Sequence, residues 1–526
     1  MIQRKTQDPT YWSDEFAVTA NDLQYLSTIL VDDELPRSVD ELSQALILHL
    51  VQQEKNLVER ALVKGTPYQP KSSYEIGESV VFPALDYRVG EVVAIRPGYN
   101  PEYGSFQVIE VKFEQGKNRE FAAFLEVDHS LNYEQQDEDE ADDTDLHTPE
   151  ELVEMYRSVV AATLEQSLES DSDFIRLAGE WFRRDLLVEV NVGHLNLAEA
   201  LLDMADGGPM STETLLGDLE LPEEISPQLR TFSLNYALQV DERFDEVGPA
   251  GEVLWYLRRM EPEAVQTTPV YLQYEPIDYN PAMLTSEMLA LEHALDDEWS
   301  TLNASEDVSE PVKITLTYPH RKSGTLPLSA RLRHIFPMGR THRIRFTLVD
   351  AGSGDEMPAW VVRKGRYIYG LEEWYETHDI PIGAYLEFEQ GDEPGKIVIR
   401  QSNPRSRREW IRVALPIDGR LTFEMRKQLI TCEYNEQMII GRNNSKDLDA
   451  VWERAHTQDI SLEQLISEIF PQLAKLSPQG TVHAATLYSA INLAVRTPPG
   501  PMLAALVDSG TYSPVGDNYW VLRARA

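Results

Sequence analysis

The sequence predicts a multidomain α+β protein in which small helical domains alternate with strand-rich domains. Three observations support this prediction. The chain has 526 residues, too many for one ordinary hydrophobic core, so several domains of roughly 100 residues are expected. Segments with apolar residues at helical spacing alternate with β-branched and aromatic segments broken by Gly and Pro. A hairpin motif occurs twice, as RFDEVGPAGEVLWYLRR (243–259) and as TYSPVGDNYWVLR (511–523).

Charge and composition narrow the functional classes. The formal net charge is −41, so the long-range field repels phosphate and any contact with nucleic acid must be local. A single cysteine, Cys432, excludes an intramolecular disulfide framework and a cysteine-based zinc cluster. The first residues contain no apolar signal region, and no segment has the roughly 18 uninterrupted apolar residues of a membrane span. We therefore expect a cytoplasmic protein with no cofactor, no bound metal and no membrane partner.

The first 70 residues predict a small helical region. Two helices are expected between Thr19 and Leu62, with N-caps at Asn21 and Ser38 and a break at Pro36. Residues 71–133 are instead rich in short strands separated by turns, which predicts a small antiparallel barrel. Its opening, GESVVFP followed by GEVVAI, resembles the start of SH3-like barrels in bacterial transcription factors.

Residues 134–173 are predicted to be an acidic linker followed by a helix. Between Glu134 and Asp173 there are 15 acidic residues and one basic residue, Arg157. The stretch from Glu134 to Asp145 cannot bury a core, so a solvated tether is the favoured interpretation. The alternative is a mimic of DNA phosphate that binds a basic groove in a partner.

Residues 174–263 and 461–526 predict two copies of one domain type. In the first copy, helices at 195–204, after Ser211 and at 226–240 precede the hairpin at 243–259. Three helices closed by a β-hairpin make the winged-helix variant of the helix-turn-helix. The second copy follows the same order in shorter form. In both hairpins a Val-Gly pair is expected to anchor and turn the wing.

Both hairpins, and YSPVGDNYWVLR in particular, resemble the closing wing of HARE-HTH domains. These winged helices are attached to bacterial RNA polymerase accessory subunits and to chromatin and DNA-repair proteins, so the resemblance implies a role in transcription or other DNA transactions. It covers roughly 65 residues per copy. The first copy departs from a DNA-binding pattern, because its third helix has one arginine, Arg230, and several acids follow it. This copy could bind protein instead.

The segment from 312 to 430 predicts a basic β-rich barrel or sandwich. It lies between a linker with a helix (264–311) and a connector (431–460). Five strand-like runs and one short helix near Leu371 to Thr377 are expected. From Lys313 to Lys427 there are 20 Lys and Arg against 14 Asp and Glu, so positive charge is concentrated here in an otherwise acidic chain.

Twelve basic residues of this segment are candidate nucleic-acid contacts, because guanidinium groups bind phosphate and the neighbouring aromatic rings can stack on bases. They are Arg331, Arg333, Arg340, His342, Arg343, Arg345, Arg363, Lys364, Arg366, Arg405, Arg407 and Arg408. The alternative is a solvated barrel face whose arginines pair with local acids.

The predicted function is non-enzymatic nucleic-acid binding, to DNA rather than RNA, by the basic barrel and the C-terminal winged helix. The acidic regions would contact a protein partner in transcription or repair. A second hypothesis is a protein-docking scaffold without nucleic-acid contact. A third is a metal-dependent nuclease that uses Asp86, Glu110 and Lys112, which a three-residue pattern supports only weakly.

Overall fold

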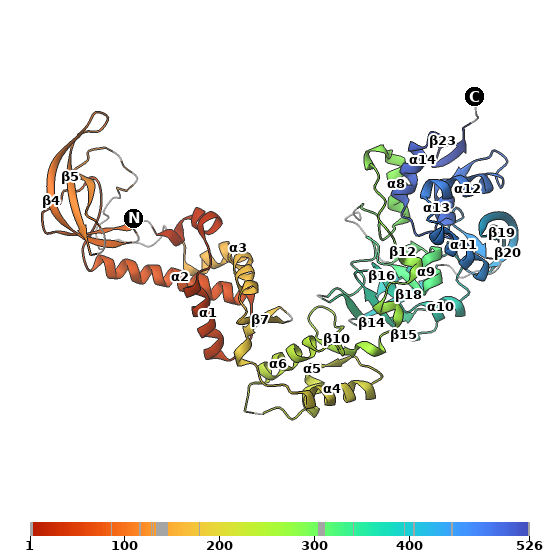
Figure 1. Cartoon of the computed structure of the whole chain (residues 1–526), viewed down its shortest axis with the longest axis horizontal. Helices are drawn as coiled ribbons and strands as arrows, with labels where there is room; N and C mark the ends of the chain where they lie inside the picture. The colour runs from red at the N-terminus through yellow and green to blue at the C-terminus, as the bar shows by residue number, and fades with distance from the viewer. Residues whose placement is uncertain are drawn as a thin grey trace. The chain divides into compact units, whose positions relative to one another are not determined.

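The protein is a mixed α+β, multidomain chain, as predicted (Figure 1). The computed structural model describes residues 4–523 except 86, 115–116, 128, 130, 133–145, 178, 223, 303–310, 340, 394, 403–405 and 443–444. The chain divides into unit 1, residues 1–190 and 221–236, and unit 2, residues 191–220 and 237–526. Within the described ranges, no helix is both long and apolar enough to cross a membrane. The predicted acidic tether at 134–145 lies outside the described residues.

Unit 1 contains a helical module closed by a small sheet. Its elements are α1 (Ala20–Asp33), β1 (Arg37–Ser38), α2 (Val39–Leu62), α3 (Pro149–Ser170), β7 (Phe174–Leu177) and β8 (Glu180–Arg183). The strands pair in the order β1-β8-β7. Ser38 caps α2 as predicted, in a capping box with Glu41. The predicted cap at Asn21 is wrong, because Thr19 caps α1 in a reciprocal box with Asp22.

A second sheet of unit 1 lies in the chain between α2 and α3. Its strands are β2 (Thr66–Pro67), β3 (Ser79–Phe82), β4 (Arg88–Asn100), β5 (Gly104–Phe113) and β6 (Arg119–Ala123), and they pair in chain order. All neighbours are antiparallel except β2 and β3. The sheet has its own core around Tyr68, Phe82 and Ile109. The predicted strand-rich segment is therefore present as a five-stranded sheet, in which β3 to β6 form an antiparallel meander.

The predicted helices and hairpin of the first copy are present. They are α4 (Val192–Met204), β9 (Met210–Ser211), α5 (Thr212–Asp218), α6 (Pro227–Val240), β10 (Phe244–Glu246) and β11 (Leu254–Leu257), with sheet order β10-β11-β9. The boundary between the units runs through α6, since residues 227–236 group with unit 1.

The helices and the hairpin predicted at the end of the chain are also present. They are α12 (Leu462–Ala474), β22 (Val482–His483), α13 (Ala484–Ile491), α14 (Pro499–Asp508), β23 (Tyr512–Gly516) and β24 (Tyr519–Leu522), with sheet order β22-β24-β23.

The same arrangement therefore occurs three times. Each instance has a helix, a short strand, two further helices and a hairpin, and its last strand lies between the other two. We call the instances module 1 (α1 to β8 without β2–β6), module 2 (α4 to β11) and module 3 (α12 to β24). Sequence reasoning found only the last two, because residues 63–148 separate the second and third helices of module 1.

The centre of unit 2 is a curled seven-stranded sheet, a half-barrel, in the order β12-β17-β18-β14-β15-β16-β13. Its strands are β12 (Val312–Thr315), β13 (Thr325–Pro327), β14 (Arg343–Asp350), β15 (Glu356–Val362), β16 (Tyr367–Tyr369), β17 (Tyr385–Gln390) and β18 (Lys396–Gln401). These include all five predicted strand-like runs, and α10 (Glu372–Thr377) is the predicted short helix. The other helices of this part are α7 (Glu263–Gln266), α8 (Ser286–Leu295), α9 (Tyr318–Ser323) and α11 (Ser445–Thr457).

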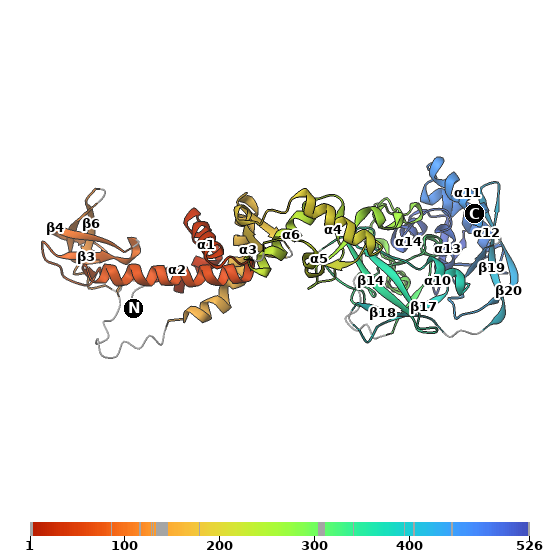
Figure 2. The same cartoon turned by 90° about the horizontal axis from the view of Figure 1, so that it is seen from below.

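Residues 407–442 form a separate three-stranded sheet, so the segment predicted as one barrel contains strands of two sheets. Its strands β19 (Arg407–Ile417), β20 (Arg420–Ile430) and β21 (Ile440–Arg442) pair in the order β20-β19-β21. One part of the β19–β20 hairpin, around Ile411 and Val413, packs into the core of the half-barrel. Leu421 and Phe423 pack into the core of module 3, where α12 lies against β20 (Figure 2).

Candidate nucleic-acid interface

Two of the predicted contact residues form ion pairs inside the fold. The Arg331 guanidinium lies 3.1 Å from the Asp296 carboxylate. Arg343 contacts two carboxylates, Asp245 at 2.7 Å and Glu261 at 3.0 Å, and the Glu261 side chain is fully buried. Burial, together with the neighbouring Asp245, raises the pKa of Glu261, because two carboxylates share one guanidinium. These arginines join parts of unit 2 to one another.

Two more predicted residues are held by aromatic rings. The Arg345 guanidinium lies 5.4 Å from the centre of the Trp360 ring and 6.0 Å from that of Tyr256. Arg366 lies 4.6 Å from the Trp299 ring and donates a hydrogen bond to a backbone carbonyl. Cation–π contacts of this kind stabilise packing but withdraw the guanidinium from a ligand.

Four predicted residues are exposed on the half-barrel. His342 precedes β14, and Arg363 and Lys364 lie in the turn between β15 and β16. The backbone N–H of Arg363 donates to the carbonyl of His342, and its side chain donates to the carbonyl of Gly339, so these residues are neighbours. Arg333 is exposed in the segment after β13. His342, Arg363 and Lys364 form a small basic edge.

The last predicted group begins the other sheet. Arg407 and Arg408 are exposed at the start of β19, whereas Arg340 and Arg405 lie outside the described residues. The predicted contacts that can be placed are thus divided between ion pairs, aromatic contacts, an edge of the half-barrel and the β19–β20 hairpin. They do not belong to one sheet.

The β19–β20 hairpin segregates its charges between two faces. Strand side chains alternate between faces, and directly paired residues share a face. Arg408 pairs with Leu429, Trp410 with Lys427, and Arg412 with Met425. We call these six residues the Trp410 face. It holds three cations and no carboxylate, whereas the same stretch of the opposite face mixes Arg407 and Arg426 with Glu409 and Glu424.

The large apolar side chains of the Trp410 face are exposed to solvent. Trp410 is 63% exposed, Leu429 57% and Met425 40%. Arg408 and Lys427 are exposed beside them. An open tryptophan between cations is the arrangement with which proteins stack on bases and attract the strand that carries them. This face is the candidate interface.

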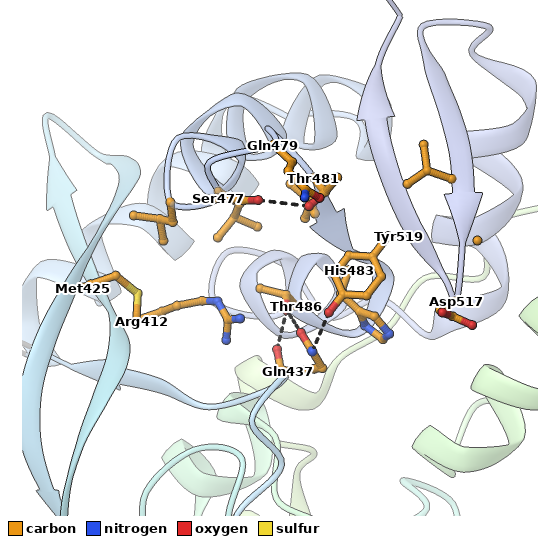
Figure 3. A pocket seen from close by; sticks show the side chains of 15 residues that line it. Arg412, Met425, Gln437, Ser477, Gln479, Thr481, His483, Thr486, Asp517 and Tyr519 are labelled. Carbon is orange, nitrogen blue, oxygen red and sulfur yellow. Dashed lines mark hydrogen bonds between the residues drawn. The ribbon is translucent and has the colours of Figure 1, made fainter.

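The face ends in a cavity of about 470 Å³ (Figure 3). The hairpin contributes Arg412 and Met425, and module 3 contributes the end of α12, the start of α13 and the β23–β24 turn. The lining residues are Arg412, Met425, Gln437, Leu473, Leu476, Ser477, Gln479, Thr481, Val482, His483, Thr486, Val515, Gly516, Asp517 and Tyr519. Because successive residues on one face of a strand are about 7 Å apart, Trp410 lies one step from the cavity and Arg408 two.

Hydrogen bonds fix the floor of the cavity. The Gln437 amide donates to the Tyr519 hydroxyl at 3.0 Å, and the Thr486 hydroxyl donates to the Gln437 backbone carbonyl at 2.6 Å. Ser477 and Thr481 join their hydroxyls at 3.0 Å. Figure 3 shows these side chains around the end of the Arg412 side chain. The cavity is therefore built from ordered polar groups.

Arg412 and His483 supply the cavity's electrostatic character. Burial lowers the pKa of His483, and the charge of Arg412 lowers it further. His483 caps α13: its Nδ1 accepts the backbone N–H of Ala485, so in the neutral ring Nε2 carries the proton. Arg412 donates to the Glu436 carbonyl at 2.6 Å, and burial lowers its pKa. It forms no ion pair with a carboxylate of the described residues.

The third helices of the three modules have few cations. In module 3 this helix, α14, has no lysine or arginine and is buried over most of its length. The third helix of module 1, α3, has five glutamates and one arginine, and α6 of module 2 has only Arg230. These helices therefore offer few groups that could bind phosphate.

The nuclease candidates do not form a metal centre among the residues that can be placed. Asp86 lies outside the described residues. Glu110 accepts a hydrogen bond from Asn118, and Lys112 is exposed on the same strand, β5. In the described part of the chain, no group of three or more His, Cys, Asp and Glu side chains could hold a metal ion. Cys432 is buried.

A larger cavity in unit 2, about 1020 Å³, has a different chemical character. Acidic residues dominate its polar lining: Asp350, Asp355, Glu356, Glu372, Glu373 and Glu376. Its only arginine, Arg345, is the one held by Trp360 and Tyr256. Such a lining repels a phosphate, so this cavity is not a candidate for nucleic acid.

Sequence reasoning identified part of the candidate interface. It named Arg408 and expected neighbouring aromatic rings to stack on bases, but it missed Arg412, Lys427 and the cavity. Comparison of the chain with protein-family models, with curated proteins and with solved structures finds no match.

Proposed function

We propose that the protein binds nucleic acid with unpaired bases, without catalysing a reaction, through the Trp410 face. The observation that supports this most directly is the 63% exposed Trp410 with Lys427 opposite it and Arg408 and Arg412 on either side. Base stacking on an aromatic ring contributes about 1–3 kcal/mol, and cations beside the ring attract the backbone. The absence of acids from this stretch of the face makes the local field positive in an acidic protein.

We further propose that the three modules are winged helices related to HARE-HTH domains. Their shared element order and strand order support this, because a winged helix has three helices and a hairpin whose last strand is central. We expect DNA to be the natural ligand. The experiment below also measures binding to RNA.

A protein-docking scaffold is the second candidate. The observation that favours it is the chemistry of the third helices: α14 is buried and uncharged in its first nine residues, and α3 is acidic. The net charge of −41 also favours basic protein partners. In this view the Trp410 face would bind a protein.

The test is fluorescence anisotropy with the full-length chain and a labelled 15-nucleotide oligo-dT, a duplex of equal length and an oligo-U. We expect the single strands to bind more tightly than the duplex. On a single strand, each cation that contacts a phosphate contributes about −0.7 to the slope of log affinity against log salt concentration. Three cations therefore give a slope of roughly −2. Trp410→Ala should weaken binding about 5-fold to 150-fold, the equivalent of about 1–3 kcal/mol of stacking. Trp410→Phe should retain most of the affinity.

Arg407 and Arg408 provide a matched pair of controls. They are consecutive, both exposed, and lie on opposite faces of β19. Arg408→Ala should reduce the salt slope by about 0.7, whereas Arg407→Ala should leave it nearly unchanged. If the full chain binds none of the probes at about 50 mM salt, where attraction is exaggerated, nucleic-acid binding is wrong and the docking scaffold is the better account.

A further inference from the structure

The cavity at the end of the Trp410 face contains Arg412, which forms no ion pair with a carboxylate among the residues that the structure describes. A partly buried guanidinium is costly unless an anion compensates it. The Arg412 guanidinium donates a hydrogen bond to the backbone carbonyl of Glu436, whose carboxylate acts on it without forming an ion pair. The nearby ion pairs show the contrast, since Arg454 contacts Glu468 at 2.9 Å. The compensating anion at Arg412 can therefore be a ligand.

Several neutral donors surround the same space. Ser477 and Thr481 present hydroxyls, Gln479 presents an amide, and the neutral His483 ring carries its proton on Nε2. Hydroxyl, amide and imidazole donors around one guanidinium suit an oxyanion with several oxygens. Asp517 is the one carboxylate in the lining, and it sits in the β23–β24 turn.

The cavity is closed on its far side, so it can receive only the end of a nucleic-acid strand. The Trp410 face leads to the cavity, but α12, the β22–β24 sheet and the β23–β24 turn enclose the far side (Figure 3). A strand that follows this face therefore has to end there. The volume of about 470 Å³ lies in the range of small-molecule sites, so a terminal nucleotide fits. A terminal phosphate also has more negative charge than a backbone phosphodiester.

We propose that this cavity binds the terminal phosphate of the nucleic-acid strand that lies on the Trp410 face. The inference rests on the proposed function for its strand, but the phosphate site itself can be tested without one. Arg412 binds the phosphate as the cation, and Ser477, Thr481 and His483 donate hydrogen bonds to its oxygens. Trp410 then stacks on a base near that end.

The experiment uses the full-length chain and oligo-dT of one length with a 5′-phosphate, a 3′-phosphate or hydroxyls at both ends. We expect one of the two phosphorylated ends to bind about 10-fold to 100-fold more tightly than the hydroxyl ends, the range for charge-assisted hydrogen bonds. Arg412→Gln should abolish this preference, and it should weaken the hydroxyl-ended strand only by the loss of one of the three cations of the Trp410 face. Asp517→Asn should increase the preference. Trp410→Ala should weaken all three strands.

A second measurement separates this inference from the proposed function. Calorimetric titration with thymidine 5′-phosphate and thymidine 3′-phosphate tests the cavity alone, in the wild type and in Arg412→Lys and Arg412→Gln. If no strand binds but a nucleotide binds in an Arg412-dependent way, the proposed function is wrong and the phosphate site stands. If the wild type binds strands without any end preference, or if Arg412→Gln keeps the preference, the phosphate site is wrong. Thermal unfolding of each variant shows that it has folded.

Discussion

Modules 2 and 3 have the same order of elements, but they attach to the rest of unit 2 by opposite parts. Module 2 attaches through its hairpin. Val247 is fully buried, its carbonyl accepts the backbone N–H of Arg345 on β14, and the N–H of Ala250 donates to the carbonyl of Met338. Its hairpin loop is therefore docked on the half-barrel.

Module 3 attaches through its helical part. Arg496, which follows α13, is buried and lies 2.7 Å from both Asp297 and Glu298 in the segment after α8. Tyr488 donates to Asp297 at 2.5 Å, and His320 on α9 lies 3.3 Å from Glu298. The hairpin of this module remains open: Val515 is 54% exposed. The expected anchoring role of the valine is confirmed for Val247 and wrong for Val515.

The comparison shows that the hairpin motif determines a turn and not a function. Where neighbouring strands cover the hairpin, its valine becomes part of the core. Where the helices are covered instead, the hairpin is left to form the wall of a cavity. The following variants test whether module 2 is attached through its hairpin and module 3 through its helical part.

The largest effect is expected for Arg496→Ala. This change leaves Asp297 and Glu298 buried without their guanidinium, which should lower the free energy of unfolding by about 3–5 kcal/mol. Hydrogen–deuterium exchange should speed up in α13 and α14 and not in module 2. Adding Asp297→Asn should restore part of the loss.

Lys396→Ala is the matched control for Arg496→Ala. Lys396 also contacts two acids, Glu356 and Glu393, but these contacts lie at the surface and should contribute far less to the free energy of unfolding. If Arg496→Ala costs no more than Lys396→Ala, the buried cluster does not hold module 3.

Gly248→Ala should have the next largest effect. A Cβ at Gly248 would lie 2.3 Å from the carbonyl oxygen of Glu252 and 3.0 Å from the backbone nitrogen of Leu254. Backbone atoms cannot move aside as a side chain can, so the substitution should cost about 2–3 kcal/mol and loosen the docked loop. Faster exchange at the Arg345 amide would report the undocking. Normal exchange there would contradict the docked hairpin.

Local signals in the sequence predicted most of the elements. Ser38 and Ser211 cap the helices that were predicted to begin after them. Both hairpins form at the Val-Gly pairs. The Trp410 face could also have been predicted from the sequence. Asp418 and Gly419 have positive φ in the tight turn of the β19–β20 hairpin, and an Asp-Gly turn fixes the register on both strands. Counting outward from it pairs Trp410 with Lys427.

Long-range contacts could not be predicted in the same way. The pairing of Arg343 with Asp245 and Glu261 joins residues about 80 to 100 positions apart, and nothing local marks it. The basic composition of 312–430 therefore overstated the number of cations available to a ligand. Module 1 was missed for a related reason, since the five-stranded sheet interrupts its helices.

Glu261→Gln tests the attachment of module 2 through pH. In the folded protein, burial and Asp245 raise the pKa of Glu261. The folded protein therefore keeps this proton at pH values where the unfolded chain has already lost it. Its contribution is complete below about pH 4.5 and is lost as the pH rises through the folded pKa. Since the folded pKa is about 8, wild-type stability should fall between about pH 4.5 and pH 8, and by on the order of 1–2 kcal/mol more than that of Glu261→Gln, with a discount for the partial exposure of the site to solvent.

Glu263→Gln is the control for that measurement. Glu263 is exposed two residues further along the chain, so its substitution should leave the pH profile as in the wild type. Arg258 and Arg343 also act on Glu261, and both keep their charge throughout this range. A steeper loss of stability in Glu261→Gln would contradict the raised pKa of Glu261.

The smallest effect is expected for Gly516→Ala, the counterpart of Gly248→Ala in module 3. Gly516 has a φ of 95°, and a Cβ there would meet no atom within 4 Å. The cost therefore comes from the backbone alone and should be about 1 kcal/mol, measured by thermal unfolding. Because the two glycines lie in separate modules, the costs of Gly248→Ala and Gly516→Ala should add in the double variant. A Gly516→Ala cost equal to that of Gly248→Ala would mean that the hairpin of module 3 is also docked, which would close the cavity wall that the terminal phosphate requires.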